Sequence, residues 1–196
     1  RKIDCVMGRS VVVIGAGLGS MHAQLAKLRG AAPVIVIDAN VDRLKMAKEV
    51  VADYTINVKE ADPIEEVMRL TNGVGADFVL EAVGSSKTYE QACKWIRSGG
   101  KVESFCICAD DDYASLPPVS FVLEEKKVSG SCAGIGYDWG DALTLLKYNR
   151  VDPMPLISMI VPLEELDDAL KEIRKNPKLI KVLVSPLVTE RTVLYE

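Results

Sequence analysis

Short apolar runs alternate along the chain with segments in which apolar residues recur every three or four positions. The runs are rich in valine and isoleucine, which is typical of strands buried on both faces of a parallel sheet. We predict strands over residues 11–14, 34–37, 54–56, 77–81, 101–107 and 127–129.

The segments between these runs have helical spacing and carry end signals. Gly30 follows the first segment, Asn40 precedes the second, and Asp62-Pro63 opens the third. Helices are predicted over residues 21–29, 41–51, 63–72, 88–97 and 138–148, whereas residues 110–118 read as an exposed loop. Alternating strands and helices predict an α/β fold, a doubly wound parallel (Rossmann) sheet with right-handed crossovers.

The pattern changes after residue 150. A segment containing Pro153 and Pro155 resembles a linker, and a strand (158–161), a helix (162–175) and a strand (181–184) follow. We therefore expect a nucleotide-binding domain over residues 1–150 and a short strand-helix-strand tail over residues 151–196.

The turn after the first strand is rich in glycine and leads directly into a helix. A dinucleotide needs backbone close to its pyrophosphate and helix N–H groups pointing at the charge. We expect Gly15, Gly17, Leu18, Gly19 and Ser20 to provide this turn. The usual G-x-G-x-x-G spacing would place glycine at position 20. Either Ser20 replaces the third glycine, or the loop is one residue short.

An acidic residue ends the second strand. Asp38 lies 23 positions after Gly15, near the spacing of about 20 at which an acid binds the adenosine ribose hydroxyls. Such an acid repels a ribose phosphate, so the sequence favours NAD over NADP. Arg43 is close enough to stack on adenine or to tolerate a phosphate.

A G-x-G-x-G turn followed by an acid also occurs in S-adenosylmethionine-dependent methyltransferases, which are the alternative from another reaction class. Those enzymes usually carry an acid two residues before the first glycine. Val13 occupies that position here, which counts against this interpretation.

Composition excludes several classes of partner. The net charge is -4 and the pI is near 5.2, which argues against nucleic acid. The longest uncharged apolar run, residues 31–37, is too short to span a membrane, and residues 1–10 lack the apolar core of a signal peptide. We expect a cytoplasmic protein.

The five cysteines show no C-x-x-C pair, and His22 is the single histidine. Reduced thiols packed in the core are expected, and a complete zinc site built by this chain is not. No residue is assigned a catalytic role.

Several segments together resemble the coenzyme-binding half of the medium-chain zinc-dependent alcohol, polyol and threonine dehydrogenases. They are 11–17, 22–27, 36–38 with Arg43-Leu44, 75–84, 98–102 and 162–170, and the resemblance covers nearly the whole chain. That family usually has one more residue between Gly17 and the helix.

The resemblance implies hydride transfer between NAD and a secondary alcohol, polyol or similar small molecule. Three loops beyond the carboxyl ends of strands would then line the cofactor: Ala82, Val83 and Gly84; Phe105, Cys106 and Ile107; Ser131 and Cys132. Core packing is the simpler explanation of Cys106 and Cys132.

In this family a preceding domain carries zinc and the proton relay, and nothing in this sequence matches it. Because the chain begins at Arg1 and not at a methionine, we expect it to be a piece of a longer protein or a processed product. Without the preceding domain, we expect the chain alone to show no turnover. Zinc would be held only by the absent domain, and the tail over residues 151–196 would pack on that domain. The resemblance also implies a homo-oligomer, often a dimer, joined along the sixth strand. A stand-alone nucleotide-sensing domain is the second alternative.

Overall fold

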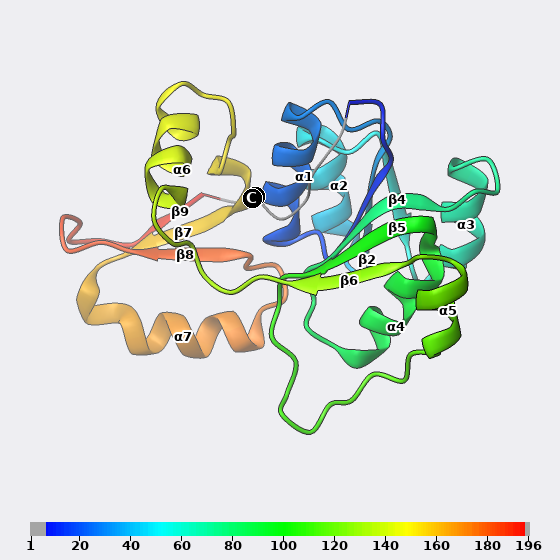
Figure 1. The fold of residues 1–196 in the computed structure, drawn as a ribbon. Coiled ribbons are helices and arrows are strands. Elements are labelled where there is room, and N and C mark those ends of the chain that lie inside the picture. The colour runs from blue at the N-terminus through cyan, green and yellow to red at the C-terminus, as the bar shows by residue number, and fades with distance from the viewer. Residues whose placement is uncertain (1–6, 195–196) are drawn as a thin grey trace. The chain divides into compact units, whose positions relative to one another are not determined.

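Six parallel strands form one sheet in the order β3-β2-β1-β4-β5-β6 (Figure 1). The structure is a computed structural model that describes residues 7–194. The strands are β1 (Val11–Ile14), β2 (Val34–Asp38), β3 (Tyr54–Asn57), β4 (Ala76–Glu81), β5 (Ile96–Ser104) and β6 (Lys127–Gly130). The order reverses direction at β1 and β4, so the predicted doubly wound sheet is confirmed.

Helices cover both faces of this sheet (Figure 1). They are α1 (Gly19–Leu28), α2 (Val41–Val50), α3 (Pro63–Leu70), α4 (Ser86–Trp95) and α5 (Pro118–Leu123), with α6 (Asp138–Lys147) after β6. Alternation along β1 sends Val11 and Val13 to the core under α1 and α2, and Val12 and Ile14 to the core under α3 and α4. This two-sided burial explains why β1 and β2 are apolar throughout.

Helix starts follow the predicted capping residues. The Asn40 side chain accepts from the backbone N–H groups of Asp42 and Arg43, and Asp62 likewise accepts from Ile64 and Glu65. Capping side chains satisfy donors that have no partner inside the helix. The sequence therefore located α2 and α3 within a residue or two.

Two predictions around β5 and α5 were wrong. The strand begins at Ile96 and ends at Ser104, whereas Gly99-Gly100 was interpreted as the end of a helix. Gly100 instead lies where a Cβ would come within 2.9 Å of the Arg97 carbonyl oxygen, so the strand requires glycine. Pro118 opens α5, because proline suits the first turn of a helix as well as a loop.

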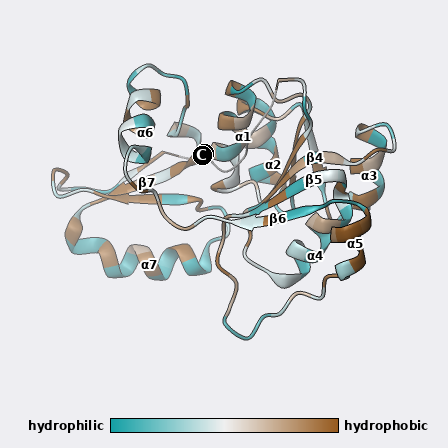
Figure 2. Ribbon diagram, in the orientation of Figure 1, coloured by the Kyte–Doolittle hydropathy of each residue, from teal (hydrophilic) through white to brown (hydrophobic). Residues whose placement is uncertain are grey.

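Among the described residues, 7–151 form one compact unit and 152–194 form a second. The second unit contains the 3-10 turns Met154–Leu156 and Leu163–Glu165, the strands β7 (Ile157–Val161), β8 (Lys181–Val184) and β9 (Thr192–Val193), and the helix α7 (Leu166–Lys175). Apolar and hydrophilic residues alternate around α7 (Figure 2). Arg191 pairs with Glu165 of the second 3-10 turn at 2.8 Å and with Glu172 of α7 at 2.7 Å, which ties the segment before β9 to both. The strand β9 was not predicted.

Across residues 7–194, every helix is too short or too polar to cross a membrane.

Asp77 joins three segments at the amino ends of the strands. Its carboxylate accepts the backbone N–H and the hydroxyl of Ser10, both at 2.9 Å, and the Nε of Arg97 at 2.7 Å. Burial raises the pKa of Asp77, but the hydrogen bonds from Arg97 and Ser10 outweigh it and hold the pKa below its usual value. The ionised form is therefore the one that the fold stabilises.

We expect Asp77→Asn to lower the free energy of unfolding by about 2 kcal/mol at pH 7, the usual range for lost charge-assisted hydrogen bonds. Because the folded-state pKa is depressed, this contribution is complete above the unfolded-state value, about 3.9, and is lost as pH falls through the folded value. Urea denaturation of both proteins at pH 7 and at pH 3 measures the difference, which should shrink at the lower pH.

Glu66→Gln provides the control. Glu66 is partly exposed and pairs with the exposed Arg69 at 2.7 Å one helical turn away, so no measurable change is expected. Equal effects of the two substitutions would contradict the role of Asp77.

Candidate dinucleotide site

The turn after β1 lies against the loop after β4. Gly15 has φ +98°, and a Cβ there would lie 2.9 Å from the Ala82 carbonyl oxygen and 3.1 Å from a methyl group of Val83. The Gly15 N–H also donates to the Ile37 carbonyl at 2.7 Å. Only glycine suits both the conformation and the available space.

Gly19 opens α1 against the strand. A Cβ on Gly19 would lie 2.8 Å from Val13 Cγ1, so this glycine allows the close packing of helix and strand. Of the two interpretations of the turn, the structure favours the shorter loop, with Gly19 in the place of the third glycine.

Ser20 lies beneath the turn rather than at its surface. It is fully buried, its hydroxyl donates to the Ala16 carbonyl at 2.6 Å, and its N–H donates to the Gly17 carbonyl at 3.1 Å. Both of its donors are therefore occupied, and Ser20 holds the turn in place.

Three consecutive backbone N–H groups of the turn have no acceptor. Within residues 7–194, those of Gly17, Leu18 and Gly19 donate to no protein atom. They lead into the first turn of α1, which Gly19 opens and where the helix dipole adds partial positive charge. This arrangement suits a phosphate group.

Asp38 ends β2 beside the turn. Its Oδ2 accepts the Ala16 N–H at 2.7 Å, and its Oδ1 accepts the Asn40 N–H at 2.8 Å. A carboxylate has about four acceptor positions, so capacity remains for ribose hydroxyls. Arg43 lies on α2, and its N–H donates to the Asn40 side chain at 3.2 Å.

The three loops predicted to line a cofactor follow neighbouring strands. Ala82 N–H donates to the Ile14 carbonyl at 2.9 Å, Phe105 N–H to Glu81 at 2.9 Å, and Ser131 N–H to Ser104 at 3.2 Å. A Cβ on Gly84 would lie 2.7 Å from the Ile107 carbonyl oxygen. The predicted residues thus gather at the carboxyl edge of the sheet.

A pocket of about 990 Å³ lies between α1, α6 and the ends of β5 and β6. Phe105, Cys106, Ile107, Ser131 and Cys132 line it, whereas the glycine turn, Asp38, Arg43 and the loop after β4 do not. The predicted site therefore has two parts, the turn with Asp38 and this pocket.

The sequence analysis missed two residues of the pocket wall. His22 packs edge-on against Phe105 with 4.2 Å between ring centroids, and burial lowers its pKa to about 4, so it is uncharged at pH 7. Glu103 is buried in the wall. The sequence did offer a signal for Glu103, because an acidic residue is unusual within a strand that is expected to be buried.

Glu81 was also missed, and it shapes the loop after β4. It is fully buried, and its Oε1 accepts the N–H groups of Val83 and Gly84 at 2.8 and 2.9 Å and the Thr88 hydroxyl at 2.9 Å. The loop conformation next to Gly15 therefore depends on this side chain.

The cysteines are less buried than expected. Among the described residues, Cys132 is exposed, Cys93, Cys106 and Cys108 are half-buried, and these four are free thiols, whereas Cys5 lies outside the described residues. Burial raises the pKa of Cys106. In residues 7–194 no group of three or more His, Cys, Asp or Glu residues is arranged to hold a metal ion.

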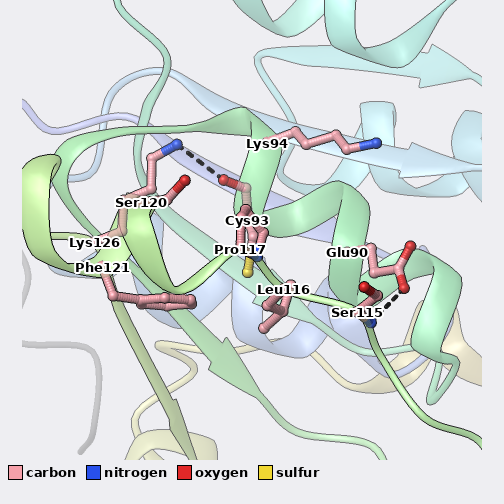
Figure 3. A pocket seen from close by; sticks show the side chains of 9 residues that line it. All are labelled: Glu90, Cys93, Lys94, Ser115, Leu116, Pro117, Ser120, Phe121 and Lys126. Atoms are coloured by element: carbon pink, nitrogen blue, oxygen red, sulfur yellow. Dashed lines mark hydrogen bonds between the residues drawn. The ribbon is translucent and has the colours of Figure 1, made fainter.

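A second, smaller pocket of about 100 Å³ lies between α4 and the segment leading into α5 (Figure 3). Glu90 accepts the Ser115 N–H at 2.6 Å, and Lys126 donates to the Cys93 carbonyl at 3.1 Å. Side-chain contacts within the protein thus hold these segments together, and none of the predicted cofactor residues lies here.

A doubly wound sheet with a glycine turn and an acid after its second strand defines a dinucleotide-binding domain. The sequence pattern of the family described as "Zinc-binding dehydrogenase" matches residues 17–148. The chain belongs to this family, which excludes the methyltransferase alternative.

Named proteins that are similar to this chain support the family assignment. The chain is 36% identical to a sorbitol dehydrogenase of Halalkalibacterium halodurans over 95% of its own length and 54% of that protein. It is 33% identical to an NADP-dependent isopropanol dehydrogenase of Clostridium beijerinckii, covering 92% of the chain and 53% of that protein. Among solved structures, an alcohol dehydrogenase from Thermus sp. ATN1 matches with a TM-score of 0.84 and 31% identity, covering 91% of the chain and 52% of the other. The chain spans about half the length of these relatives.

We expect Gly15→Ala to lower the free energy of unfolding by about 1–3 kcal/mol, because the new Cβ meets the Ala82 carbonyl at a positive φ. Gly140→Ala is the matched control. Gly140 lies in α6 with no atom within 4 Å of the added Cβ, so alanine should be neutral or stabilising there. Urea denaturation measures both, and similar effects at the two positions would contradict the close approach of the turn to β4.

Proposed function

We propose that this chain binds NAD at the carboxyl edge of its parallel sheet. The observation that carries the proposal is the row of three unpartnered N–H groups at Gly17, Leu18 and Gly19, next to the Asp38 carboxylate. The N–H groups suit the pyrophosphate, and Asp38 suits the ribose hydroxyls. Arg43 would lie on the adenosine side, and the loops at 82–84, 105–107 and 131–132 would face the nicotinamide half.

Apolar side chains exposed at this edge support the proposal. Val83 and Phe105 are among them, and Leu18 is 44% and Ile107 89% exposed. A cluster of exposed apolar side chains at one edge is typical of a surface that a ligand or another domain covers.

In the whole protein, the proposed activity is hydride transfer from a secondary alcohol, polyol or similar small molecule to NAD. This rests on the names of the relatives, which include sorbitol, alcohol and threonine dehydrogenases. The described residues would bind and orient the dinucleotide. Zinc would be held by a separate domain, which residues 152–196 would contact.

We expect the isolated chain to bind NAD more tightly than NADP by at least about tenfold, because a second phosphate would lie against the Asp38 carboxylate. Asp38→Ala should lose most of this preference. Isothermal titration calorimetry with both dinucleotides measures the ratio.

Asp42→Asn is the control for net charge. It removes one carboxylate from the first turn of α2, four residues from Asp38, and should keep the preference for NAD. Tighter binding of NADP by the unmodified chain would contradict the assignment of Asp38, and binding of neither dinucleotide would contradict the proposed function.

Purified chain supplied with NAD, zinc and a secondary alcohol should form no NADH above background, because residues 7–194 hold no metal-ligand group. Absorbance at 340 nm measures the product. Turnover at ordinary enzyme rates would show that the chain carries its own catalytic machinery.

We further propose that two copies pair along β6. This strand lies at the edge of the sheet, so one side of its backbone has no neighbouring strand within the sheet. Such an edge is a template for pairing with another chain. A reducing, cytoplasmic setting is proposed as well, because Cys93, Cys106, Cys108 and Cys132 are free thiols.

A further inference from the structure

Two consecutive peptide groups in the loop after β4 have the same orientation. The N–H groups of Val83 and Gly84 both donate to one oxygen, the Oε1 of Glu81, at 2.8 and 2.9 Å. Glu81 is fully buried, and the Thr88 hydroxyl donates to the same oxygen at 2.9 Å. The N–H groups of this loop therefore point into the protein.

The carbonyl groups of the same two peptides point the other way. Both peptide bonds are trans, and in a planar trans peptide the carbonyl oxygen lies opposite the N–H hydrogen. The carbonyls of Ala82 and Val83 therefore point away from the buried carboxylate of Glu81. Among residues 7–194, neither carbonyl accepts a hydrogen bond from the protein. The loop thus presents two acceptors that have no partner.

The glycine turn beside this loop presents the opposite polarity. In the described part of the chain, the N–H groups of Gly17, Leu18 and Gly19 donate to no protein atom. The Ala82 carbonyl oxygen lies next to this turn, 2.9 Å from the position of a Cβ on Gly15. A pyrophosphate offers only acceptors, which suit the turn, whereas a hydroxyl or an amide NH2 can donate to the loop.

We propose that Glu81 is a positioning residue for the nicotinamide half of the dinucleotide. By accepting both loop N–H groups, it directs the carbonyls of Ala82 and Val83 outward. There they accept hydrogen bonds from the ribose hydroxyls or the carboxamide NH2 of the nicotinamide riboside. The inference rests on the proposed function, because it requires the dinucleotide to lie at this edge of the sheet. It adds that a buried side chain, which itself touches no ligand, decides which half of the dinucleotide the loop accepts.

Three nucleotides of increasing length test the proposal: ADP, ADP-ribose and NADH, each titrated by calorimetry into the unmodified chain and into Glu81→Met. Methionine has a similar length but provides no oxygen acceptor, so the loop N–H groups lose their partner. Glu81→Met should weaken the binding of NADH relative to that of ADP by about tenfold, a loss typical of one or two hydrogen bonds. A parallel loss for ADP-ribose would assign the ribose hydroxyls as the donors, and a loss for NADH alone would assign the carboxamide.

A purely structural role of Glu81 would weaken all three nucleotides alike, because only the folded fraction would change. Asp77→Asn is the matched control. Asp77 is a buried carboxylate that stabilises the opposite edge of the sheet, so this substitution should leave the ratio of NADH to ADP affinity unchanged. An unchanged ratio in folded Glu81→Met would overturn the proposal.

A double variant guards against loss of folding. Glu81→Met with Thr88→Val also removes the buried hydroxyl that donates to Oε1, and replacing both partners of a buried hydrogen bond by apolar groups can be nearly neutral. This variant should show the same change in the ratio of NADH to ADP affinity as Glu81→Met. A ratio equal to that of the unmodified chain would overturn the proposal.

Glu81→Gln should restore the ratio of the unmodified chain. The amide oxygen accepts the same three donors, and the NH2 group replaces Oε2, which has no hydrogen-bond partner among the described residues. A loss in Glu81→Gln as large as in Glu81→Met would overturn the role assigned to Oε1. Failure of the unmodified chain to bind any of the three nucleotides would instead contradict the proposed function, so the two failures are distinguishable.

Discussion

The contact between the turn after β1 and its neighbours is the constraint on which the rest of this structure depends. Gly15 lies against the Ala82 carbonyl, and Gly19 lies against the Val13 side chain, so the backbone of the turn comes close at two positions where a Cβ would not fit. These approaches bring the first turn of α1 to the junction of β1 and β4. The free N–H groups, Asp38 and the loop after β4 meet there because of this packing.

Buried or half-buried carboxylates stabilise the loops around that contact. Asp38 joins the glycine turn to the end of β2, and Glu81 shapes the loop after β4. Asp77 joins β1, β4 and β5 at the opposite edge. Each accepts at least one backbone N–H, and Asp77 is also paired with Arg97, so directed donors balance the negative charge. The shape of the candidate site and the stability of the fold thus both depend on carboxylates that accept backbone N–H groups.

Local patterns predicted most of the first unit. The valine and isoleucine runs of β1 and β2 are buried on both faces, and Asn40 and Asp62 cap helices as their positions suggested. The failures arose where one residue type fits two conformations. Gly99-Gly100 suits a helix end or a strand with close neighbours, and Pro118 suits a loop or the first helical turn. Local sequence does not distinguish these cases, because neighbouring strands and helices decide between them.

The sequence by itself determined the class of fold, the glycine turn and the acid after the second strand, because these depend on residue type and short spacing. Only the tertiary structure decided that Gly19 packs against β1 while Ser20 is buried with both donors occupied. It also placed His22 and Glu103 in the wall of one pocket. Residues more than 80 positions apart become neighbours there through the order of the strands, and no local pattern contains that order.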